Sequence, residues 1–177
     1  MAIYTLAFKK MLINEGGYVN DKDDPGGETY KGVARKIWPN WKGWDIIDGL
    51  KKSPGLPGTL DANLILHGHI MDFYEQNYWG KVRGNDFTNQ EIAESIFDFG
   101  VNAGNGTSVC LALLAADLPP DGKLNDSDVA VINSMDPEKF LASFALAKIS
   151  KYVGICNKNP VMKKYFFGWI VRSLKMN

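Results

Sequence analysis

Glu15 is the residue whose type and position point most directly to chemistry. It stands in the last turn of a helix predicted to begin near Thr5, directly before Gly16 and Gly17. The carbonyl end of a helix disfavours an ionised carboxylate, and aromatic side chains that exclude water would raise its pKa further. A carboxylic acid that stays protonated near neutral pH can donate a proton to a glycosidic oxygen. The two glycines leave room for a bulky substrate.

A second acidic group follows Glu15 on a predicted turn. Asp24 comes nine positions later, and Asp21 is the alternative to it. The Asp-Pro-Gly-Gly sequence predicts a tight turn, and the short segments on either side predict a β-hairpin that returns through Thr29. A hairpin beside a helix end can hold a second carboxylate across a cleft from Glu15. Inverting glycosidases separate their two carboxyl groups by about 6.5–9.5 Å and retaining ones by about 5–5.5 Å, and the sequence selects neither.

The acidic turn and the two histidines of the chain also have explanations that involve neither catalysis nor a metal ion. An acidic turn after a helix is also typical of a solvated surface. A calcium loop of the EF-hand type is a poor match: with Asp21 as the first ligand, Pro25 and Gly32 occupy the positions that need an oxygen ligand and a glutamate. His67 and His69 stand two positions apart on a predicted helix, so they point to different faces. We therefore expect no metal ion and no cofactor.

The composition predicts a packed globular protein of one domain or two small lobes. The chain has 177 residues, of which 45% are hydrophobic, and its 20 basic side chains equal its 20 acidic ones. A formal charge of zero argues against a nucleic-acid-binding protein. No stretch approaches the roughly 20 apolar residues that span a bilayer, and the first residues lack the basic segment of a signal peptide. We therefore expect synthesis in the cytoplasm without a signal peptide, no integral membrane segment and no nucleic-acid partner.

Helical periodicity extends over most of the chain. We expect a mainly α fold of about seven or eight helices, with one small β-hairpin near the N-terminus. The clearest helix is predicted over 61–79, where apolar residues recur at steps of three and four. A short helix is expected over 34–38 and a loop over 40–59. The apolar stripe of the clearest helix consists of Leu60, Leu64, His67, Met71, Tyr74 and Tyr78.

The second half of the chain has clear helix starts. Thr88 and Glu91 form a T-x-x-E capping box. Asp136 directly precedes Pro137, a residue that suits the first position of a helix. Residues 80–88 are the best boundary between two lobes.

The motif EGGY at 15–18 and its continuation VNDKDDPGGETYKGV resemble the signature of glycoside hydrolase family 108, the phage-type N-acetylmuramidases. Blocks similar to later parts of that family follow in matching order. The second half also resembles the helical peptidoglycan-binding segment that is usually fused to the catalytic one. The later blocks are FYEQNYW at 73–79, IAESIFDFGVNAGNGT at 92–107 and FFGWIVR at 166–172.

The resemblance implies a lysozyme-like α+β fold. Residues 1–84 would form the catalytic segment and residues 85–177 a helical peptidoglycan-binding-like segment, packed with it as one compact unit. The second segment departs from the usual wall-binding repeat after Asp121-Gly122, so its alternative role is to complete the fold and one wall of the cleft. Basic side chains gather towards the C-terminus, where they either form a solvated helix face or attract the anionic wall.

By position, the resemblance implies that Glu15 is the general acid. Asp24 would hold the attacking water with Thr29, which comes one residue earlier than in the commoner phage spacing. The amide of Asn102 either holds an acetamido group or caps a helix. The candidates for substrate binding are Tyr18, Asp21, Tyr30, Tyr74 and Asn102. The candidates for cleft walls, with the core as the alternative, are Trp38, Trp41 and Trp44.

Together these observations predict a peptidoglycan hydrolase. As a lysozyme (N-acetylmuramidase), it would cleave the β-1,4 bond between N-acetylmuramic acid and N-acetylglucosamine, in the manner of a phage or prophage endolysin. It would act in the periplasm or cell wall after release through a holin or a secretion system. Two alternatives stay open: a non-catalytic peptidoglycan-binding or secretion-activator protein of the same fold, and a lytic transglycosylase that needs only Glu15.

Overall fold

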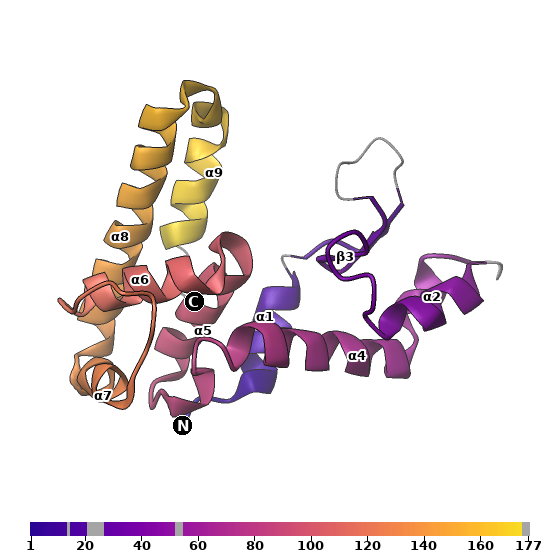
Figure 1. Cartoon of the computed structure of the whole chain (residues 1–177), viewed down its shortest axis with the longest axis horizontal. Coiled ribbons are helices and arrows are strands. Elements are labelled where there is room, and N and C mark those ends of the chain that lie inside the picture. Colours follow the sequence, from indigo (N-terminus) through magenta and orange to yellow (C-terminus); the bar gives the residue numbers. More distant parts are fainter. Residues whose placement is uncertain (14, 21–26, 52–54, 175–177) are drawn as a thin grey trace. The chain divides into compact units, whose positions relative to one another are not determined.

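The computed structural model describes residues 1–13, 15–20, 27–51 and 55–174, and it is mainly α-helical, as predicted (Figure 1). These described residues contain nine α-helices and one small antiparallel sheet. The chain divides into two compact units, which we describe separately. The N-terminal unit is Phe8–Asn77, and the C-terminal unit is Met1–Ala7 with Tyr78–Asn177. Helix α1 (Tyr4–Ile13) contributes residues to both units.

The N-terminal unit combines the end of α1 with a three-stranded sheet and three further helices. The strands pair antiparallel in the order β1-β2-β3, with Tyr18 opposite Tyr30 and Tyr30 opposite Val33. The predicted hairpin is therefore confirmed as the β1–β2 pair, and β3 adds a second one. The elements after α1 are β1 (Tyr18–Val19), β2 (Thr29–Tyr30), β3 (Val33–Ala34), α2 (Gly43–Leu50), α3 (Gly58–Asp61) and α4 (Leu64–Tyr74).

A two-residue turn of Lys31 and Gly32 joins β2 to β3. Their φ angles are 43° and 80°, and positive φ at both central positions is the requirement of a type I′ hairpin turn. The turn brings Val33 and Ala34 into the sheet, where both are buried. The helix predicted over 34–38 is wrong, because its first residue belongs to β3 and residues 35–37 form a turn.

Helix α2 lies within the segment 40–59, which is predicted as a loop. Trp44 and Ile47 are spaced to bury one face of this helix, and the Trp44 indole N–H donates a hydrogen bond to the Trp38 carbonyl oxygen (2.8 Å). Glycines at 43 and 49 weaken the helical signal in the sequence, since glycine has a low helix propensity. Tertiary packing, and not local helix propensity, therefore stabilises this helix.

Helix α4 buries a face that shares Tyr74 with the predicted stripe but is otherwise different. Leu66, Ile70 and Phe73 lie in the core, whereas Leu64, which belongs to the predicted stripe, is 85% exposed. Asn63 explains the difference, because its backbone is extended and its side chain caps α4 by accepting a hydrogen bond from the Leu66 amide (2.9 Å). This break separates α3 from α4, so the two helices do not share one apolar stripe.

The C-terminal unit packs the first residues of the chain against its helices. The Ala2 amide donates a hydrogen bond to the Phe87 carbonyl oxygen (2.8 Å), and the Tyr4 ring packs on Trp79 and Phe97, with ring centres 5.6 and 6.1 Å apart. The elements from the end of α4 onward are η1 (Glu75–Trp79), η2 (Gly84–Asp86), α5 (Gln90–Ala103), α6 (Asn105–Ala115), α7 (Asp126–Ser134), α8 (Pro137–Lys158), η3 (Pro160–Met162) and α9 (Lys163–Leu174).

Two helix starts test the predicted caps. The Asp136 side chain accepts a backbone hydrogen bond (2.9 Å), with Pro137 at the first position of α8, as predicted. The box predicted at Thr88 is wrong by one residue, because the side chain of Asn89 caps α5. The Thr88 amide and hydroxyl instead donate hydrogen bonds to the Asn133 side chain (2.9 and 3.2 Å).

Lys148 is an exception to the solvated basic face expected near the C-terminus. Its side chain is buried between α5 and α8, with Nζ 3.0 Å from Ser95 Oγ and 4.3 Å from the centre of the Phe144 ring. Burial lowers the pKa of this amine to about 8. The residue therefore belongs to the core of the C-terminal unit.

Candidate active site

Glu15 lies just beyond the C-terminal end of α1. The helix ends at Ile13, and the Glu15 amide donates a hydrogen bond to the Leu12 carbonyl oxygen (3.2 Å). The sequence places Glu15 in the last helical turn, but in the structure Glu15 follows that turn. It keeps the expected place at the carbonyl end of the helix, and its side chain is half-buried.

The Glu15 carboxylate lies against the turn between β2 and β3. A Cβ atom on Gly32 would lie 2.6 Å from Glu15 Oε2 and closer still to the Tyr74 hydroxyl, so only a hydrogen atom fits there. The Tyr74 hydroxyl donates a hydrogen bond to the Lys31 carbonyl oxygen (2.8 Å). The segment after α1, the β2–β3 turn and the end of α4 therefore meet at one place. We call Glu15, Gly32 and Tyr74 the Glu15 cluster.

Aromatic packing inside the N-terminal unit holds Tyr74 in this place. Its side chain is buried, and its ring centre lies 5.3 Å from that of Phe73 and 6.1 Å from that of Phe8. A buried hydroxyl needs a hydrogen-bond partner, which the Lys31 carbonyl supplies. The packing thus fixes α4 relative to the turn, and the turn fixes the surroundings of the Glu15 carboxylate.

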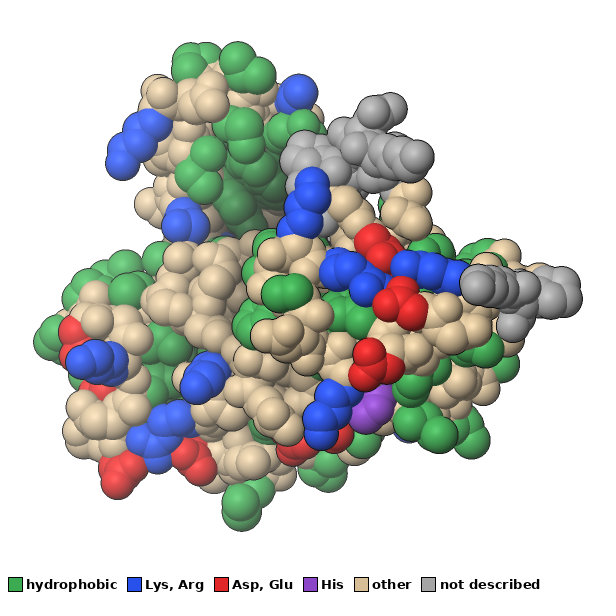
Figure 2. All heavy atoms as spheres, turned by 45° about the vertical axis from the view of Figure 1, so that its right-hand side comes forward, with side chains coloured by type: hydrophobic (Ala, Val, Ile, Leu, Met, Phe, Trp, Pro, Cys, Tyr) green, Lys and Arg blue, Asp and Glu red, His purple; other side chains and the backbone are tan. Residues whose placement is uncertain are grey.

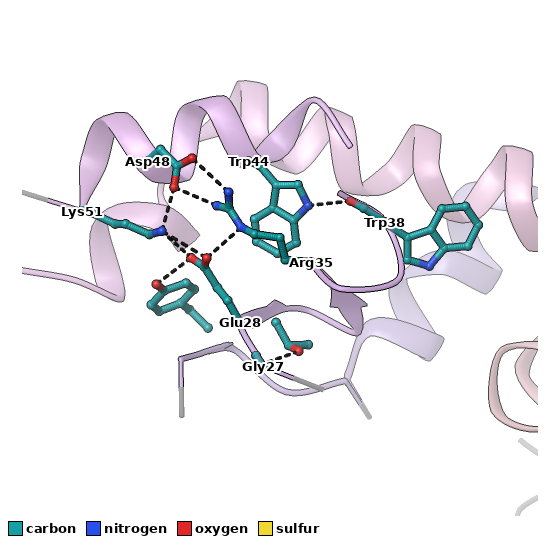
Figure 3. A network of polar contacts seen from close by, with 9 residues as sticks. Gly27, Glu28, Arg35, Trp38, Trp44, Asp48 and Lys51 are labelled. Atoms are coloured by element: carbon teal, nitrogen blue, oxygen red, sulfur yellow. Dashed lines mark hydrogen bonds and ion pairs between the residues drawn. The ribbon is translucent and has the colours of Figure 1, made fainter. Parts of the chain in front are cut away.

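A second carboxylate, Glu28, directly precedes β2 and is held by cations (Figure 3). Glu28 Oε2 lies 2.7 Å from Arg35 Nε, and Oε1 lies 2.9 Å from Lys51 Nζ. The Tyr18 hydroxyl donates a hydrogen bond to Glu28 Oε1 (2.8 Å). Asp48 of α2 accepts hydrogen bonds from both cations. This Glu28 network of five side chains ties the β1–β2 hairpin to α2.

Hydrogen bonds within the network and burial shift the pKa values of Asp48 and Tyr18. Hydrogen bonds from Arg35 and then Lys51 lower the pKa of Asp48 to about 2. Burial, followed by the hydrogen bond to Glu28, raises the pKa of Tyr18. The side chain of Glu28 is only 10% exposed and has both cations beside it, which suits an anchor for the hairpin.

An open groove lies beside α4 in the same unit. Its volume is about 320 Å³, and its walls combine aromatic rings with side-chain amides. Trp38 packs edge-on against Phe73, with ring centres 5.0 Å apart, and the Trp41 indole N–H donates to the His69 carbonyl oxygen (3.3 Å). Phe73 connects the groove to the Glu15 cluster, since its ring also packs against Tyr74. The residues that line this tryptophan groove are Ile37, Trp38, Pro39, Asn40, Trp41, Phe73 and Asn77.

Residues 8–104 match the protein family described as Glycosyl hydrolase 108, and the match covers more than half of the chain. The chain belongs to the glycosyl hydrolase 108 family. Among solved structures, it is similar to the structure of Brucella abortus SagA, with a TM-score of 0.68 and 21% sequence identity over 98% of this chain and 90% of that one. At that identity, the likeness shows a shared fold. No curated protein matches the chain.

The family 108 match includes the Glu15 cluster, the Glu28 network and the tryptophan groove. Membership supports a glycoside hydrolase, a class that commonly uses two carboxyl groups. Glu15 is one candidate, and its predicted partners, Asp24 and Asp21, lie outside the described residues. Within the described part of the chain, no three His, Cys, Asp or Glu side chains gather to hold a metal ion.

The predicted substrate-binding tyrosines of the family 108 domain differ in exposure. Tyr18 is half-buried, whereas Tyr30 is buried, donates a hydrogen bond to the Leu60 carbonyl oxygen (3.4 Å) and stacks on Trp41. Burial, with the charge of Asp61 next in weight, raises the pKa of Tyr30 to about 12. Tyr30 therefore packs in the core of this unit, and its contact with a substrate stays a prediction.

Thr29 and Asn102 occupy different units. Thr29 lies on β2, and its hydroxyl donates a hydrogen bond to the Gly27 carbonyl oxygen (3.3 Å). Asn102 lies on α5 of the C-terminal unit, where its amide donates to the Asp98 carbonyl oxygen (2.6 Å). This bond within the helix is structural, and binding of an acetamido group by Asn102 stays a prediction.

Sequence reasoning does not single out Gly32 or Glu28 as part of the site. Gly32 alone is a weak hairpin signal, because glycine suits one of the two positive-φ positions of the turn whereas Lys31 does not suit the other. No comparable signal marks Glu28, because its cationic partners reach it only through the packing of α2 and the hairpin.

Proposed function

We propose that this chain is a peptidoglycan hydrolase that acts as a lysozyme, cleaving the β-1,4 bond between N-acetylmuramic acid and N-acetylglucosamine. The observation that carries the proposal is the Glu15 cluster. There a carboxylate at a helix end lies against a glycine turn, inside residues that match a glycosyl hydrolase family. Because Gly32 has no side chain, the carboxylate can lie against the turn without being displaced or covered.

In the proposed reaction, Glu15 donates its proton to the glycosidic oxygen. The bond between that oxygen and C1 of the muramic acid ring breaks as oxocarbenium-like charge develops on the ring. A water forms the new bond to C1 and gives its proton to the second carboxylate. We assign that role to Asp24, with Thr29 orienting the water and Asp21 as the alternative. One product then ends in reducing N-acetylmuramic acid.

The glycan would bind along the tryptophan groove and the tyrosines beside it. Indole faces suit the C–H surfaces of sugar rings, and side-chain amides suit acetamido groups, so Trp38, Trp41 and Asn40 are the proposed groove contacts. This composition of aromatic rings with a few polar groups is typical of ligand sites. The other proposed substrate contacts are Tyr18, Asp21, Tyr30, Tyr74 and Asn102.

The proposed partner is bacterial peptidoglycan. Residues 1–84 would supply the catalytic segment and residues 85–177 the peptidoglycan-binding-like segment. Release through a holin or a secretion system would bring the enzyme to the periplasm or cell wall, in the manner of an endolysin.

Digestion of purified sacculi tests the proposal. The protein should release soluble fragments whose mass spectra show reducing N-acetylmuramic acid ends. Reducing N-acetylglucosamine ends would reassign the bond, and anhydro-muramic acid ends would indicate a lytic transglycosylase. Retention on sacculi without release of fragments would indicate a non-catalytic binding or secretion-activator protein.

A further inference from the structure

The C-terminal part of the chain is strongly basic, although the chain as a whole is neutral. From Lys139 onward, the sequence contains eight Lys and Arg residues and no Asp or Glu. The described part of this segment forms α8, η3 and α9. Lys148 is buried and Arg172 pairs with Asp98, whereas Lys139, Lys158, Lys163 and Lys164 are exposed. A surface block of one charge sign points to a partner surface of the opposite sign.

The exposed face of α9 is apolar, where a surface helix is normally polar. Phe167, Val171 and Leu174 follow at steps of four and three, so they share one side of the helix, and they are 79%, 39% and 56% exposed. Lys163 and Lys164 are exposed at the start of the same helix. We call these five residues the outer face of α9.

Contacts within the C-terminal unit hold the opposite side of α9. Trp169 stacks on Tyr152 of α8 with ring centres 4.7 Å apart, and Arg172 forms a 3.0 Å ion pair with Asp98 of α5. Ser173 is buried. The two helices run side by side (Figure 1), and hydrophobic side chains gather on the lobe that they form at the top of Figure 2, with basic side chains at its edges. Helix α9 is therefore anchored on one side and presents its outer face on the other.

We propose that the outer face of α9 binds the surface of an anionic phospholipid membrane. Apolar side chains gain free energy on entering the acyl boundary, and lysines beside them gain from anionic head groups. A wall polymer offers charge but no apolar phase, so three exposed apolar side chains favour lipid. No helix among the described residues is both long and apolar enough to cross a bilayer, which makes this an association with the membrane surface.

Flotation of the full chain with lipid vesicles tests this inference. The protein should float with vesicles of phosphatidylglycerol and phosphatidylethanolamine but not with phosphatidylcholine vesicles. The double variant Phe167→Ser/Val171→Ser should bind anionic vesicles at least about tenfold more weakly, because two apolar side chains lose their burial. Ile65→Ser removes a 68% exposed side chain from α4 and is the matched control, which should bind like the wild type.

Charge reversal separates the electrostatic part of the binding. Lys163→Glu/Lys164→Glu should weaken vesicle binding by about tenfold or more, and added salt should weaken wild-type binding. All substituted side chains are exposed, so thermal midpoints should stay unchanged.

Three results would overturn the inference. One is no flotation with anionic vesicles. Another is an equal loss in the apolar double variant and the Ile65 control. The third is a wild type that does not bind vesicles, together with outer-face variants that bind sacculi less well or no longer self-associate. None of these results depends on glycosidase activity.

Discussion

The carboxylate of Glu15 occupies the space that a side chain at residue 32 would need, and Gly32 leaves that space open. A Cβ atom at residue 32 would lie 2.6 Å from Glu15 Oε2 and 3.3 Å from its carboxyl carbon. Gly32 also has a φ of 80°, in the left-handed region that residues with a side chain disfavour. Glycine at this position therefore serves both the turn and the placement of Glu15.

Replacing Gly32 should damage activity and stability together. In Gly32→Ala, the new methyl group displaces the Glu15 carboxylate, so release of fragments from sacculi should fall at least about tenfold. The strained φ should lower the free energy of unfolding by about 1–2 kcal/mol, measured in urea.

Gly49→Ala is the matched control for this substitution. A Cβ there meets no atom within 4 Å and lies on helix α2, so activity should persist and stability should rise by about 0.5–1 kcal/mol. Wild-type activity in Gly32→Ala would contradict the role given to this turn.

The Tyr74 hydroxyl should matter for both activity and folding. Tyr74→Phe removes the hydrogen bond to the Lys31 carbonyl oxygen, which should lower the free energy of unfolding by about 0.5–1.5 kcal/mol. Freed from this bond, the turn can move relative to Glu15, and the sacculus hydrolysis rate should fall several-fold. Tyr165→Phe, on α9, removes another tyrosine hydroxyl and should leave hydrolysis unchanged; similar rates in both variants would refute the positioning role.

The Glu28 network should stabilise the hairpin. Glu28→Gln removes the charge between Arg35 and Lys51, and since its side chain is nearly buried, the free energy of unfolding should fall by about 1–3 kcal/mol. Asp48→Asn, at the exposed end of the same network, should cost less than about 1 kcal/mol. Urea unfolding near neutral pH measures both, and an equal loss in the two variants would show that Glu28 is not the central member.

Because of Lys148, the free energy of unfolding of the C-terminal unit should rise with pH in the alkaline range. Burial lowers its pKa from 10.5 to about 8, so between these values the unfolded chain holds a proton that the folded chain has lost. The free energy of unfolding therefore rises with pH across this window. Lys148→Met should be about 1–3 kcal/mol more stable than the wild type near pH 7, and the difference should shrink towards pH 10.

Lys151→Met provides the control for this titration, since Lys151 lies half-exposed on the same helix. Urea unfolding of both variants and the wild type at several pH values makes the comparison. A stability difference between Lys148→Met and the wild type that stays constant with pH would contradict the assignment.

The sequence correctly predicts the start of an element where residues adjacent in the chain set that start. Asp136 and Pro137 set the start of α8 locally, and the structure confirms it. The buried face of α4 is different, because the break at Asn63 sets the helix phase and Leu64 then points outward. Helix α2 likewise depends on tertiary packing that overrides its weak propensity.

The candidate site also has one part that the sequence predicts and another part that it does not. Glu15 can be singled out from the sequence because the helix end and the glycines around it are local features. The turn and the tyrosine beside it come from distant parts of the chain. Their approach depends on positive φ at Lys31 and on the burial of Tyr74, and neither follows from residue type.

Proton donation by Glu15 is the central claim, and the rate of fragment release from purified sacculi by Glu15→Gln tests it most directly. Glutamine keeps the size of the side chain but cannot supply the proton, so the account predicts a loss of at least about a hundredfold. The thermal midpoint should stay within a few degrees of the wild type. Release at the wild-type rate by folded Glu15→Gln would contradict the account.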